Sequence, residues 1–248
     1  MKCCLVTICI GEKYLSEYNN LFKPSQEKYA EKCGYDFKVI TDYIQKPYDK
    51  SLISFNKILV CDYNWDKEYD YIIFVDADIV INKNTPSLHD YYDFGEKIGV
   101  VNQSQPITET IIRIEEKIDK LHEITANDYY KLKANLYIET DKILNTGVLV
   151  IQPQKHNIFL RNIFNKYYKT QINNQSGFHY EQSVIGFELQ KNNMYFIMDM
   201  KWNALWSTNK YYYNVMKKVN LTLQEFYNKN YFIHLAGHTD FHLVKIIN

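Results

Sequence analysis

The chain has 248 residues, of which 46% are hydrophobic, and its 29 basic residues balance 29 acidic residues. This length fits one large α/β domain or two small ones, and the apolar fraction excludes a disordered chain. A formal net charge of zero gives no electrostatic basis for binding nucleic acid or an anionic membrane.

The cysteines indicate a compartment for the protein. All five lie in the first quarter of the chain, at Cys3, Cys4, Cys9, Cys33 and Cys61. Their number is odd and they form no CxxC pair with metal-site spacing, so buried, reduced thiols are the simplest interpretation. We therefore expect a reducing, cytoplasmic location. The apolar residues 5–10 are too few for a signal sequence or a membrane span, so we expect no transmembrane segment.

The first hundred residues predict an alternation of strands and helices. Apolar runs predict strands over residues 3–10, 35–41 and 71–75, and helical periodicity predicts helices over residues 15–33 and 51–63. Gly34 is placed to cap the first of these helices. The β-α-β-α-β order implies a parallel sheet with right-handed crossovers.

The second half continues the α/β pattern less regularly. We expect strands over residues 98–101, 144–151, 194–197 and 231–233, and helices over residues 156–168 and 181–189. Residues 107–135 are charged and helical in pattern, and we expect a solvated insert there. No repeat or linker divides the chain, so we expect a single domain over residues 1–248, whose first half is a sheet of the nucleotide-binding type.

Two carboxylates follow the third predicted strand. The apolar run that ends at Val75 leads directly into Asp76 and Asp78. In open α/β sheets, ligands bind just outside the carboxyl ends of buried parallel strands. Two adjacent acids there repel each other unless a cation lies between them, and carboxylate oxygens suit Mg²⁺ or Mn²⁺, which also hold a substrate's phosphates. The pattern therefore predicts a metal site, although an accidental Asp-x-Asp at a solvated strand end is the alternative.

Two classes of enzyme fit this pattern. The string Asp-Ala-Asp-Ile-Val at 76–80 matches the motif of magnesium-dependent phosphatases, in which Asp76 would be the nucleophile. It also matches nucleotide-sugar transferases, where the acidic pair holds a metal-bound diphosphate. The phosphatase needs a second acidic pair, but after Asn145 the only aspartates are Asp199 and Asp240, which lie far apart. The motif also arrives after two βα units, which disfavours the phosphatase.

An ordered set of motifs gives a family resemblance. The set comprises Leu-Val-Thr at 5–7, Asn-Lys-Ile at 56–58, Val-Asp-Ala-Asp at 75–78, Leu-Asn-Thr-Gly-Val at 144–148, Glu-Gln-Ser-Val-Ile at 181–185 and Phe-Ile-His-Leu-Ala-Gly at 232–237. In this order the chain resembles glycosyltransferases of the GT-A fold, close to the glycogenin-like and bacterial lipopolysaccharide galactosyltransferase group. Two departures stand out: Glu181 replaces the usual Asp, and His-Thr-Asp at 238–240 stands where the group has Lys-Pro-Trp.

The resemblance implies a fold and an activity. It implies a single GT-A domain with a Rossmann-like, mostly parallel central sheet flanked by helices, in which residues 1–101 form the nucleotide-binding half and residues 102–248 the acceptor-side half. It implies a metal-dependent hexosyltransferase that uses Mn²⁺ or Mg²⁺ and a nucleotide sugar, a UDP-hexose by this likeness, with retention of configuration. The acceptor would be a glycan, glycoprotein or glycolipid. A catalytically inactive nucleotide-sugar-binding module is the alternative.

The same resemblance suggests roles for individual residues. Asp76 and Asp78 would hold the cation, and Ala77 lies between them. His234 would be the third protein ligand, with a buried, hydrogen-bonded histidine at a strand end as the alternative. Lys57 would bring positive charge to the phosphates or the donor sugar, unless it is an ordinary lysine on a helix surface.

Glu181, Gln182 and Asn145 would face the donor sugar. Gln182 is assigned as a positioning group near the β face and Glu181 as the residue that orients the sugar. A helix N-terminal carboxylate is the alternative for Glu181. If the reaction inverts configuration, Glu181 or Asp199 would be the first candidates for the base.

Residues near the two ends of the chain complete the expected donor site. Thr7 would bond the nucleoside and Tyr14 would stack on it, with surface packing as the alternative for Tyr14. Gly237 would allow close backbone approach, and His238 would replace the lysine that contacts the diphosphate. Trp202 and Trp206 would lie near the acceptor, with core packing as the alternative for at least one of them.

Overall fold

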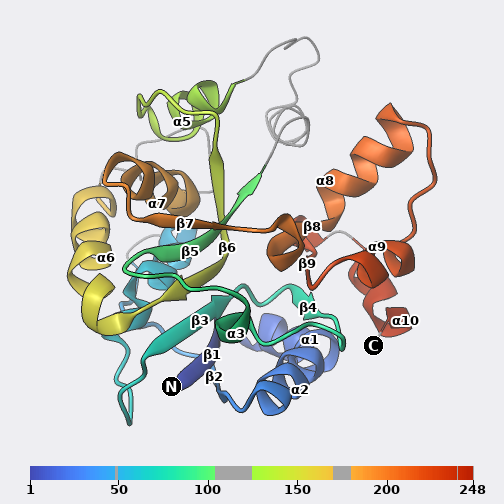
Figure 1. Ribbon diagram of the computed structural model, residues 1–248, viewed down its shortest axis with the longest axis horizontal. Coiled ribbons are helices and arrows are strands. Elements are labelled where there is room, and N and C mark those ends of the chain that lie inside the picture. Colours follow the sequence, from blue (N-terminus) through green and yellow to red (C-terminus); the bar gives the residue numbers. More distant parts are fainter. Residues whose placement is uncertain (48–49, 104–124, 170–179, 239, 248) are drawn as a thin grey trace.

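A six-stranded sheet forms the centre of the computed structural model, which describes residues 1–47, 50–103, 125–169, 180–238 and 240–247 (Figure 1). Its strand order is β2-β1-β3-β6-β5-β7. The strands are β1 (Cys3–Ile8), β2 (Asp36–Ile40), β3 (Tyr71–Val75), β5 (Ile98–Gln103), β6 (Ile143–Ile151) and β7 (Tyr195–Met198). Only β6 runs against its neighbours, so the expected mostly parallel α/β sheet is confirmed.

Helices cover the sheet on both sides and bury both faces of its strands β1, β3, β5 and β6. Successive side chains of a strand point to opposite faces. Ile72 and Phe74 of β3 pack in one cluster with residues of η1 (Lys50–Asp62), α6 (Pro153–Tyr167) and α7 (Tyr180–Lys191). Ile73 and Val75 pack in a second cluster with residues of α2 (Lys23–Cys33). The alternation explains why this strand reads as a continuous apolar run.

A second sheet of three short strands lies beside the first. Its order is β4 (Ile79–Ile81), β9 (Phe232–His234) and β8 (Ala204–Leu205), with β4 antiparallel and β8 parallel to β9. The strand expected over residues 231–233 is β9, whereas the sequence analysis did not predict β4 or β8. The remaining elements are α3 (Leu88–Tyr91), α5 (Ala126–Ala134), η3 (Met200–Asn203), α8 (Trp206–Tyr211), η4 (Tyr212–Met216), α9 (Leu223–Lys229), η5 (Ala236–His238), η6 (Phe241–Leu243) and α10 (Val244–Ile247).

The helix expected over residues 15–33 is two helices. They are α1 (Glu12–Leu21) and α2, and they meet at Phe22, which ends the first and precedes the second. Pro24 lies in the first turn of α2, and because proline has no N–H it cannot continue the hydrogen-bond ladder of α1. Gly34 does end α2, with a left-handed backbone (φ 69°) and its N–H directed to Ala30 and Glu31.

Two further expectations need correction. The segment expected as an α-helix over residues 51–63 is the 3-10 helix η1, which is buried at Leu52 and throughout residues 55–61. The solvated insert expected over residues 107–135 is wrong for α5, because Ala126, Tyr130 and other residues of that helix are buried against α7. The rest of that prediction, over residues 107–124, lies outside the described residues.

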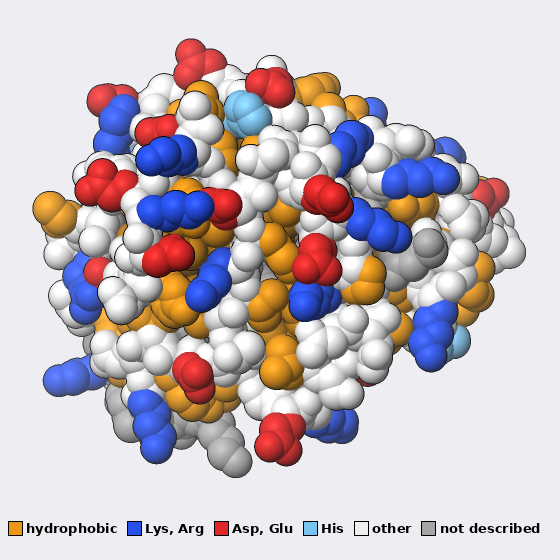
Figure 2. All heavy atoms as spheres, turned by 90° about the horizontal axis from the view of Figure 1, so that it is seen from below, with side chains coloured by type: hydrophobic (Ala, Val, Ile, Leu, Met, Phe, Trp, Pro, Cys, Tyr) orange, Lys and Arg blue, Asp and Glu red, His pale blue; other side chains and the backbone are white. Residues whose placement is uncertain are grey.

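The surface charge, the thiols and the helix lengths can each be compared with what the sequence predicted. Figure 2 shows acidic and basic side chains mixed over one face of the molecule. All five cysteines have free thiols, and four of them are buried while Cys33 is half-buried. Within the described residues, no helix is both long and apolar enough to cross a membrane. The cytoplasmic location stays a prediction.

Candidate metal and donor site

Strand pairing brings His234 to the acidic pair. β3 ends at Val75, and the chain turns through Asp76 and Asp78 before β4 begins at Ile79. In the pairing of β4 with β9, Ile79 lies opposite His234. The Leu235 N–H donates to the Asp78 carbonyl over 3.0 Å, which extends this pairing by one step. Residues 156 positions apart in the sequence therefore share one end of the small sheet.

The three side chains predicted as metal ligands lie together. The Nε2 atom of His234 is 3.2 Å from Oδ1 of Asp78 and 3.8 Å from Oδ2 of Asp76. One ligand atom from each residue lies within 4.8 Å of the others. The two carboxylates are about a quarter exposed (25% and 28%), whereas the imidazole is buried. Two carboxylate oxygens and one imidazole nitrogen form a ligand set that suits Mn²⁺ and also accepts Mg²⁺.

A chain of amides orients the His234 ring. The backbone N–H of Gly147 donates to Asn145 over 2.8 Å, which identifies that side-chain atom as Oδ1. The Asn203 Nδ2 group donates to the same oxygen, so the Asn203 Oδ1 atom faces His234 Nδ1 at 2.9 Å. Because an amide oxygen only accepts, Nδ1 carries the proton and Nε2 is the nitrogen directed at the acids. The network thus leaves Nε2, rather than Nδ1, as the ring nitrogen that could bind a cation.

Gly147 supports the site in a second way. A Cβ atom at this position would lie 2.6 Å from both Cε1 and Nδ1 of His234, which no real contact allows. Its carbonyl accepts the N–H of Asp76 over 2.8 Å. Glycine is therefore required where β6 passes beneath the ring, and the space it leaves is filled by the imidazole. The donor set, its orientation and this close fit are all consistent with a divalent cation.

Gln26 holds the turn that carries the acids. Its side chain is fully buried, and its Nε2 group donates to the carbonyls of Ile79 over 2.9 Å and of Asp76 over 3.4 Å. The Tyr18 hydroxyl donates to Gln26 Oε1 over 2.9 Å. The sequence analysis missed this residue because a polar residue within an amphipathic helix carries no motif.

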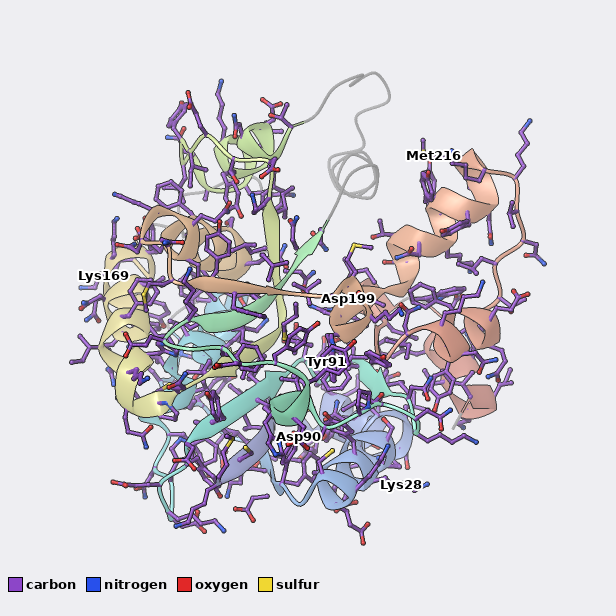
Figure 3. All side chains as sticks on the ribbon, viewed as in Figure 1. Lys28, Asp90, Tyr91, Lys169, Asp199 and Met216 are labelled. Carbon is purple, nitrogen blue, oxygen red and sulfur yellow. The ribbon has the colours of Figure 1, made fainter. Side chains whose placement is uncertain are left out.

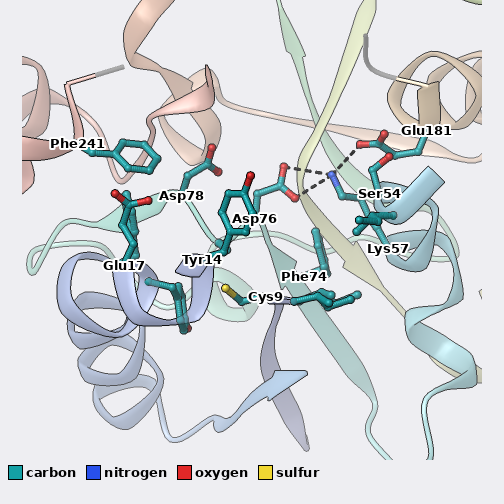
Figure 4. Close-up of a pocket in the computed structure, with 16 residues that line it drawn as sticks. Cys9, Tyr14, Glu17, Ser54, Lys57, Phe74, Asp76, Asp78, Glu181 and Phe241 are labelled. Atoms are coloured by element: carbon teal, nitrogen blue, oxygen red, sulfur yellow. Dashed lines mark hydrogen bonds and ion pairs between the residues drawn. The ribbon is translucent and has the colours of Figure 1, made fainter. Parts of the chain in front are cut away.

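Lys57 lies between two carboxylates of the site. Its Nζ atom is 2.8 Å from Oδ1 of Asp76 and 3.2 Å from Oε1 of Glu181, and its side chain is buried (Figure 4). Burial acts to lower the pKa of Lys57, but the two carboxylates outweigh it and raise that pKa above its ordinary value. The alternative of a lysine on a helix surface is therefore wrong.

The ionisation of the ligand residues is coupled. Burial acts to lower the pKa of His234, but Asp78 and then Asp76 outweigh burial and raise it. Burial acts in the opposite sense on Asp78, yet the imidazole lowers the pKa of that carboxyl below its ordinary value. Burial raises the pKa of Asp76 despite the lowering effect of Lys57 and His234. Without a cation, the site therefore favours a protonated imidazole that faces an ionised Asp78.

A pocket of about 320 Å³ opens beside this cluster. Six of the predicted site residues line it: Tyr14, Lys57, Asp76, Ala77, Asp78 and Glu181. Glu17, Ser54 and Phe241 line it as well, and sequence reasoning did not select them. Figure 4 shows Glu17 and Phe241 on one side of the acids and Lys57 with Glu181 on the other, with the Tyr14 ring between Asp78 and Asp76 in this view. The pocket falls in the size range of small-molecule sites in proteins.

Other predicted residues lie off the pocket. Thr7 is fully buried and is not among the lining residues. Asn145 is buried, and its described hydrogen bonds go to Gly147 and Asn203. Gln182 is also buried, and its Nε2 group donates to the Tyr129 hydroxyl over 2.8 Å. Their contacts with a donor stay predictions.

The segment after His234 contains two more predicted residues. Gly237 is exposed and has a left-handed backbone (φ 76°) three residues beyond His234. The side chain of His238 lies outside the described part of the chain, so its contact with a diphosphate stays a prediction.

Both tryptophans expected near an acceptor are core residues. Trp202 is fully buried and packs against Tyr231 and Phe232. Trp206 is 1% exposed, and its Nε1 group donates to Asp240 over 2.8 Å. Neither ring offers a face to a sugar, so the core-packing alternative holds for both.

Comparison with known proteins places this chain in a family. The sequence matches the glycosyl transferase family 8 profile over residues 1–239. The chain belongs to glycosyl transferase family 8. This membership and the sheet described above identify a glycosyltransferase of the GT-A fold. A sequence search among curated proteins finds no match.

Solved structures share the fold of this family 8 glycosyltransferase. A glycosyltransferase involved in the glycosylation of the major capsid of PBCV-1 superimposes with a TM-score of 0.61 at 12% identity, covering 100% of this chain and 98% of that one. The galactosyltransferase LgtC, solved with donor and acceptor sugar analogs, gives 0.57 at 13% identity, covering 98% and 94%. GlyE of Streptococcus pneumoniae TIGR4 gives 0.55 at 12% identity, covering 100% and 60%. At these identities the likeness establishes the fold.

Proposed function

We propose that this family 8 glycosyltransferase transfers a hexose from a nucleotide sugar, with UDP-hexose as donor, in a reaction that needs Mn²⁺ or Mg²⁺. The acceptor is a glycan, free or carried by a protein or lipid. One observation carries the proposal: ligand atoms of Asp76, Asp78 and His234 lie within 4.8 Å of one another, and both aspartates line the pocket. A diphosphate bound in that pocket would share a cation with the three residues.

The charges around the pocket fit a diphosphate leaving group. Asp76, Asp78 and His234 would hold the cation, which when bound supplies positive charge where the departing nucleoside diphosphate gains negative charge. Lys57 lies between Asp76 and Glu181 and forms an ion pair with each of them. This pairing keeps Asp76 available as a ligand and fixes Glu181 at the edge of the pocket, where we assign it to orient the donor sugar.

The remaining donor contacts are assigned by position. Tyr14 is 54% exposed and lines the pocket, so part of its ring surface is accessible for stacking on a base. Thr7, Asn145, Gly237 and His238 keep the donor-binding roles proposed from the sequence. We assign Gln182 a positioning role near the anomeric carbon in a retaining reaction. Most of the pocket is lined by residues 8–78, which supports residues 1–101 as the donor half and residues 102–248 as the acceptor half.

A catalytically inactive nucleotide-sugar-binding module is the competing function, whereas family membership argues against the phosphatase. The test is a screen of UDP-glucose, UDP-galactose and other nucleotide sugars for Mn²⁺-dependent hydrolysis, with Asp78→Asn as the control. We expect hydrolysis of one donor above the others, abolished by the substitution and by chelation. Mn²⁺-dependent UDP binding without turnover of any donor would support the inactive module.

A further inference from the structure

An apolar tip forms where α8 continues into η4. We define the tip as residues 211–219. Five of the fifteen large exposed hydrophobic residues in the described chain lie within these nine positions: Tyr211 (38%), Tyr213 (39%), Val215 (56%), Met216 (43%) and Val219 (55%). Single exposed apolar residues are ordinary, but such a cluster marks a surface that something covers.

The tip projects from the body of the protein. Figure 1 shows α8 rising away from the sheets, and Figure 3 places Met216 at its outer end. None of the residues of η4 is buried, and α8 buries only Trp206 and Thr208. Tyr, Asn and Val are weak helix formers, and a helix this short has little stability in water without packing. A partner that covers the tip would supply the missing packing.

The segment around the tip carries positive charge only. Residues 200–224 contain no Asp or Glu but four lysines, at Lys201, Lys210, Lys217 and Lys218. Lys210 pairs with Asp240, whereas Lys217 and Lys218 follow directly on the exposed Met216. Because the whole chain is neutral, the remaining residues carry the balancing excess of acid. Although the chain has a net charge of zero, the tip and its flanking residues are therefore cationic and apolar.

We propose that the tip binds the surface of an anionic membrane. Tyrosine rings suit the boundary between headgroups and acyl chains, and lysine stems lie on apolar surface while their amines reach phosphates. The Val and Met side chains add apolar area that buries just below the headgroups. The tip is a projecting end rather than a groove, so it fits a deformable bilayer better than a rigid protein partner. The proposal does not depend on the identity of the donor.

The location of the tip links membrane binding to the reaction. Leu205 of β8 pairs with His234 of β9, and α8 begins at the next residue, Trp206. From Trp206 to Met216 the helical segment spans roughly 15 Å at 1.5 Å per residue. A tip seated in the headgroups would therefore hold the cation site within a short distance of the bilayer, where an acceptor glycan carried by a lipid would be presented.

Sedimentation with lipid vesicles tests the proposal. We expect the wild-type protein to sediment with vesicles of phosphatidylcholine and phosphatidylglycerol, not with phosphatidylcholine alone, and to be released by salt. Lys217→Gln with Lys218→Gln should weaken binding roughly five-fold per charge removed, and Val215→Ser with Met216→Ser should weaken it further. The matched controls are Lys28→Gln with Lys229→Gln and the exposed Ile158→Ser of α6, which should bind as wild type.

A fluorescent reporter locates the contact. Tyr213→Trp should add a blue-shifted emission with the anionic vesicles only, measured as the difference from wild type because three native tryptophans also emit. Donor hydrolysis should be unchanged in all tip variants, so a failure of this proposal can be told from a failure of the proposed function. Three results would overturn it: no wild-type binding to anionic vesicles, equal binding by the tip variants, or a wild-type dimer that the tip variants abolish without any vesicle binding.

Discussion

Gly147 and His234 lie so close that only a glycine fits beneath the imidazole. A methyl group at residue 147 would lie 2.6 Å from Cε1 and Nδ1 of the ring. The same glycine donates its N–H to Asn145 and accepts the N–H of Asp76 through its carbonyl. One position on β6 therefore influences the location of two of the three predicted ligands.

Gly147→Ala should weaken the cation site. The added methyl group must displace the His234 ring, so we expect Mn²⁺ affinity to fall roughly 10-fold or more, as when support of a ligand is lost. Overpacking should also cost about 1–3 kcal/mol of unfolding free energy. Calorimetric titration with Mn²⁺ and thermal unfolding measure the two effects.

Gly99→Ala is the control for that substitution. Its Cβ would lie 2.5 Å from the Phe94 ring and 2.9 Å from Val150, well outside the site. We expect a similar loss of stability with unchanged Mn²⁺ affinity. Equal affinities for Gly147→Ala and wild type would show that the ring tolerates displacement, and would contradict the tight fit inferred here.

Asn203→Ala should lower Mn²⁺ affinity roughly 10–100-fold, because Nδ1 of His234 loses the acceptor that orients it. Asn203→Asp keeps an acceptor for that N–H and should retain more affinity, although its carboxylate faces Asn145 unfavourably. Asn209→Ala, which removes a hydrogen bond to the Leu205 carbonyl, is the matched control. An Asn203→Ala protein that binds Mn²⁺ as wild type does would remove Asn203 from the site.

Mn²⁺ affinity should rise with pH. The raised pKa of His234 means that its imidazole stays protonated above the ordinary value of about 6.5. A cation must displace this proton, so affinity should fall as pH drops through the His234 pKa, and binding should release a proton into buffer. Without metal, the stability of the fold depends on pH in the opposite direction. Because the pKa of His234 is raised, its protonation stabilises the fold at low pH, and this contribution is lost as pH rises through the His234 pKa. An affinity that is flat with pH would show that His234 is not a ligand.

Gln182→Ala should reduce turnover more than UDP affinity, because we place its side chain near the sugar rather than the nucleotide. Its amide donates to the Tyr129 hydroxyl, so Tyr129→Phe should loosen Gln182 and produce a smaller loss of turnover. Steady-state hydrolysis and UDP titration separate the two effects. Weakened UDP binding with normal turnover would remove Gln182 from the sugar pocket.

The sequence predicted the parts of the fold that have a strong local signal. The run before Asp76 is apolar because β3 is buried on both faces, and the acids follow at its carboxyl end. The resemblance to a family then selected His234. The helix break at Phe22 was not predicted, because helical periodicity continues across it and only Pro24 marks the change.

The support of the site could not be read from the sequence. Asn145 and Asn203 are 58 residues apart, and only their folded positions put them in one hydrogen-bond chain. Within Lys-Trp-Asn at 201–203, the sequence analysis selected Trp202, whereas Asn203 is the residue that bonds to His234, the predicted metal ligand. Lys57 was ambiguous for the same reason: its burial depends on Glu181, which lies 124 positions later.

The central claim is that a cation held by Asp76, Asp78 and His234 binds the diphosphate of a nucleotide sugar. Titration of UDP into wild type and Asp78→Asn, each with and without Mn²⁺, tests it most directly, with circular dichroism to show that the fold is intact. We predict that wild type binds UDP only with Mn²⁺ and that the variant loses this dependence together with the binding. Equal, Mn²⁺-dependent UDP affinity in the two proteins would contradict the account.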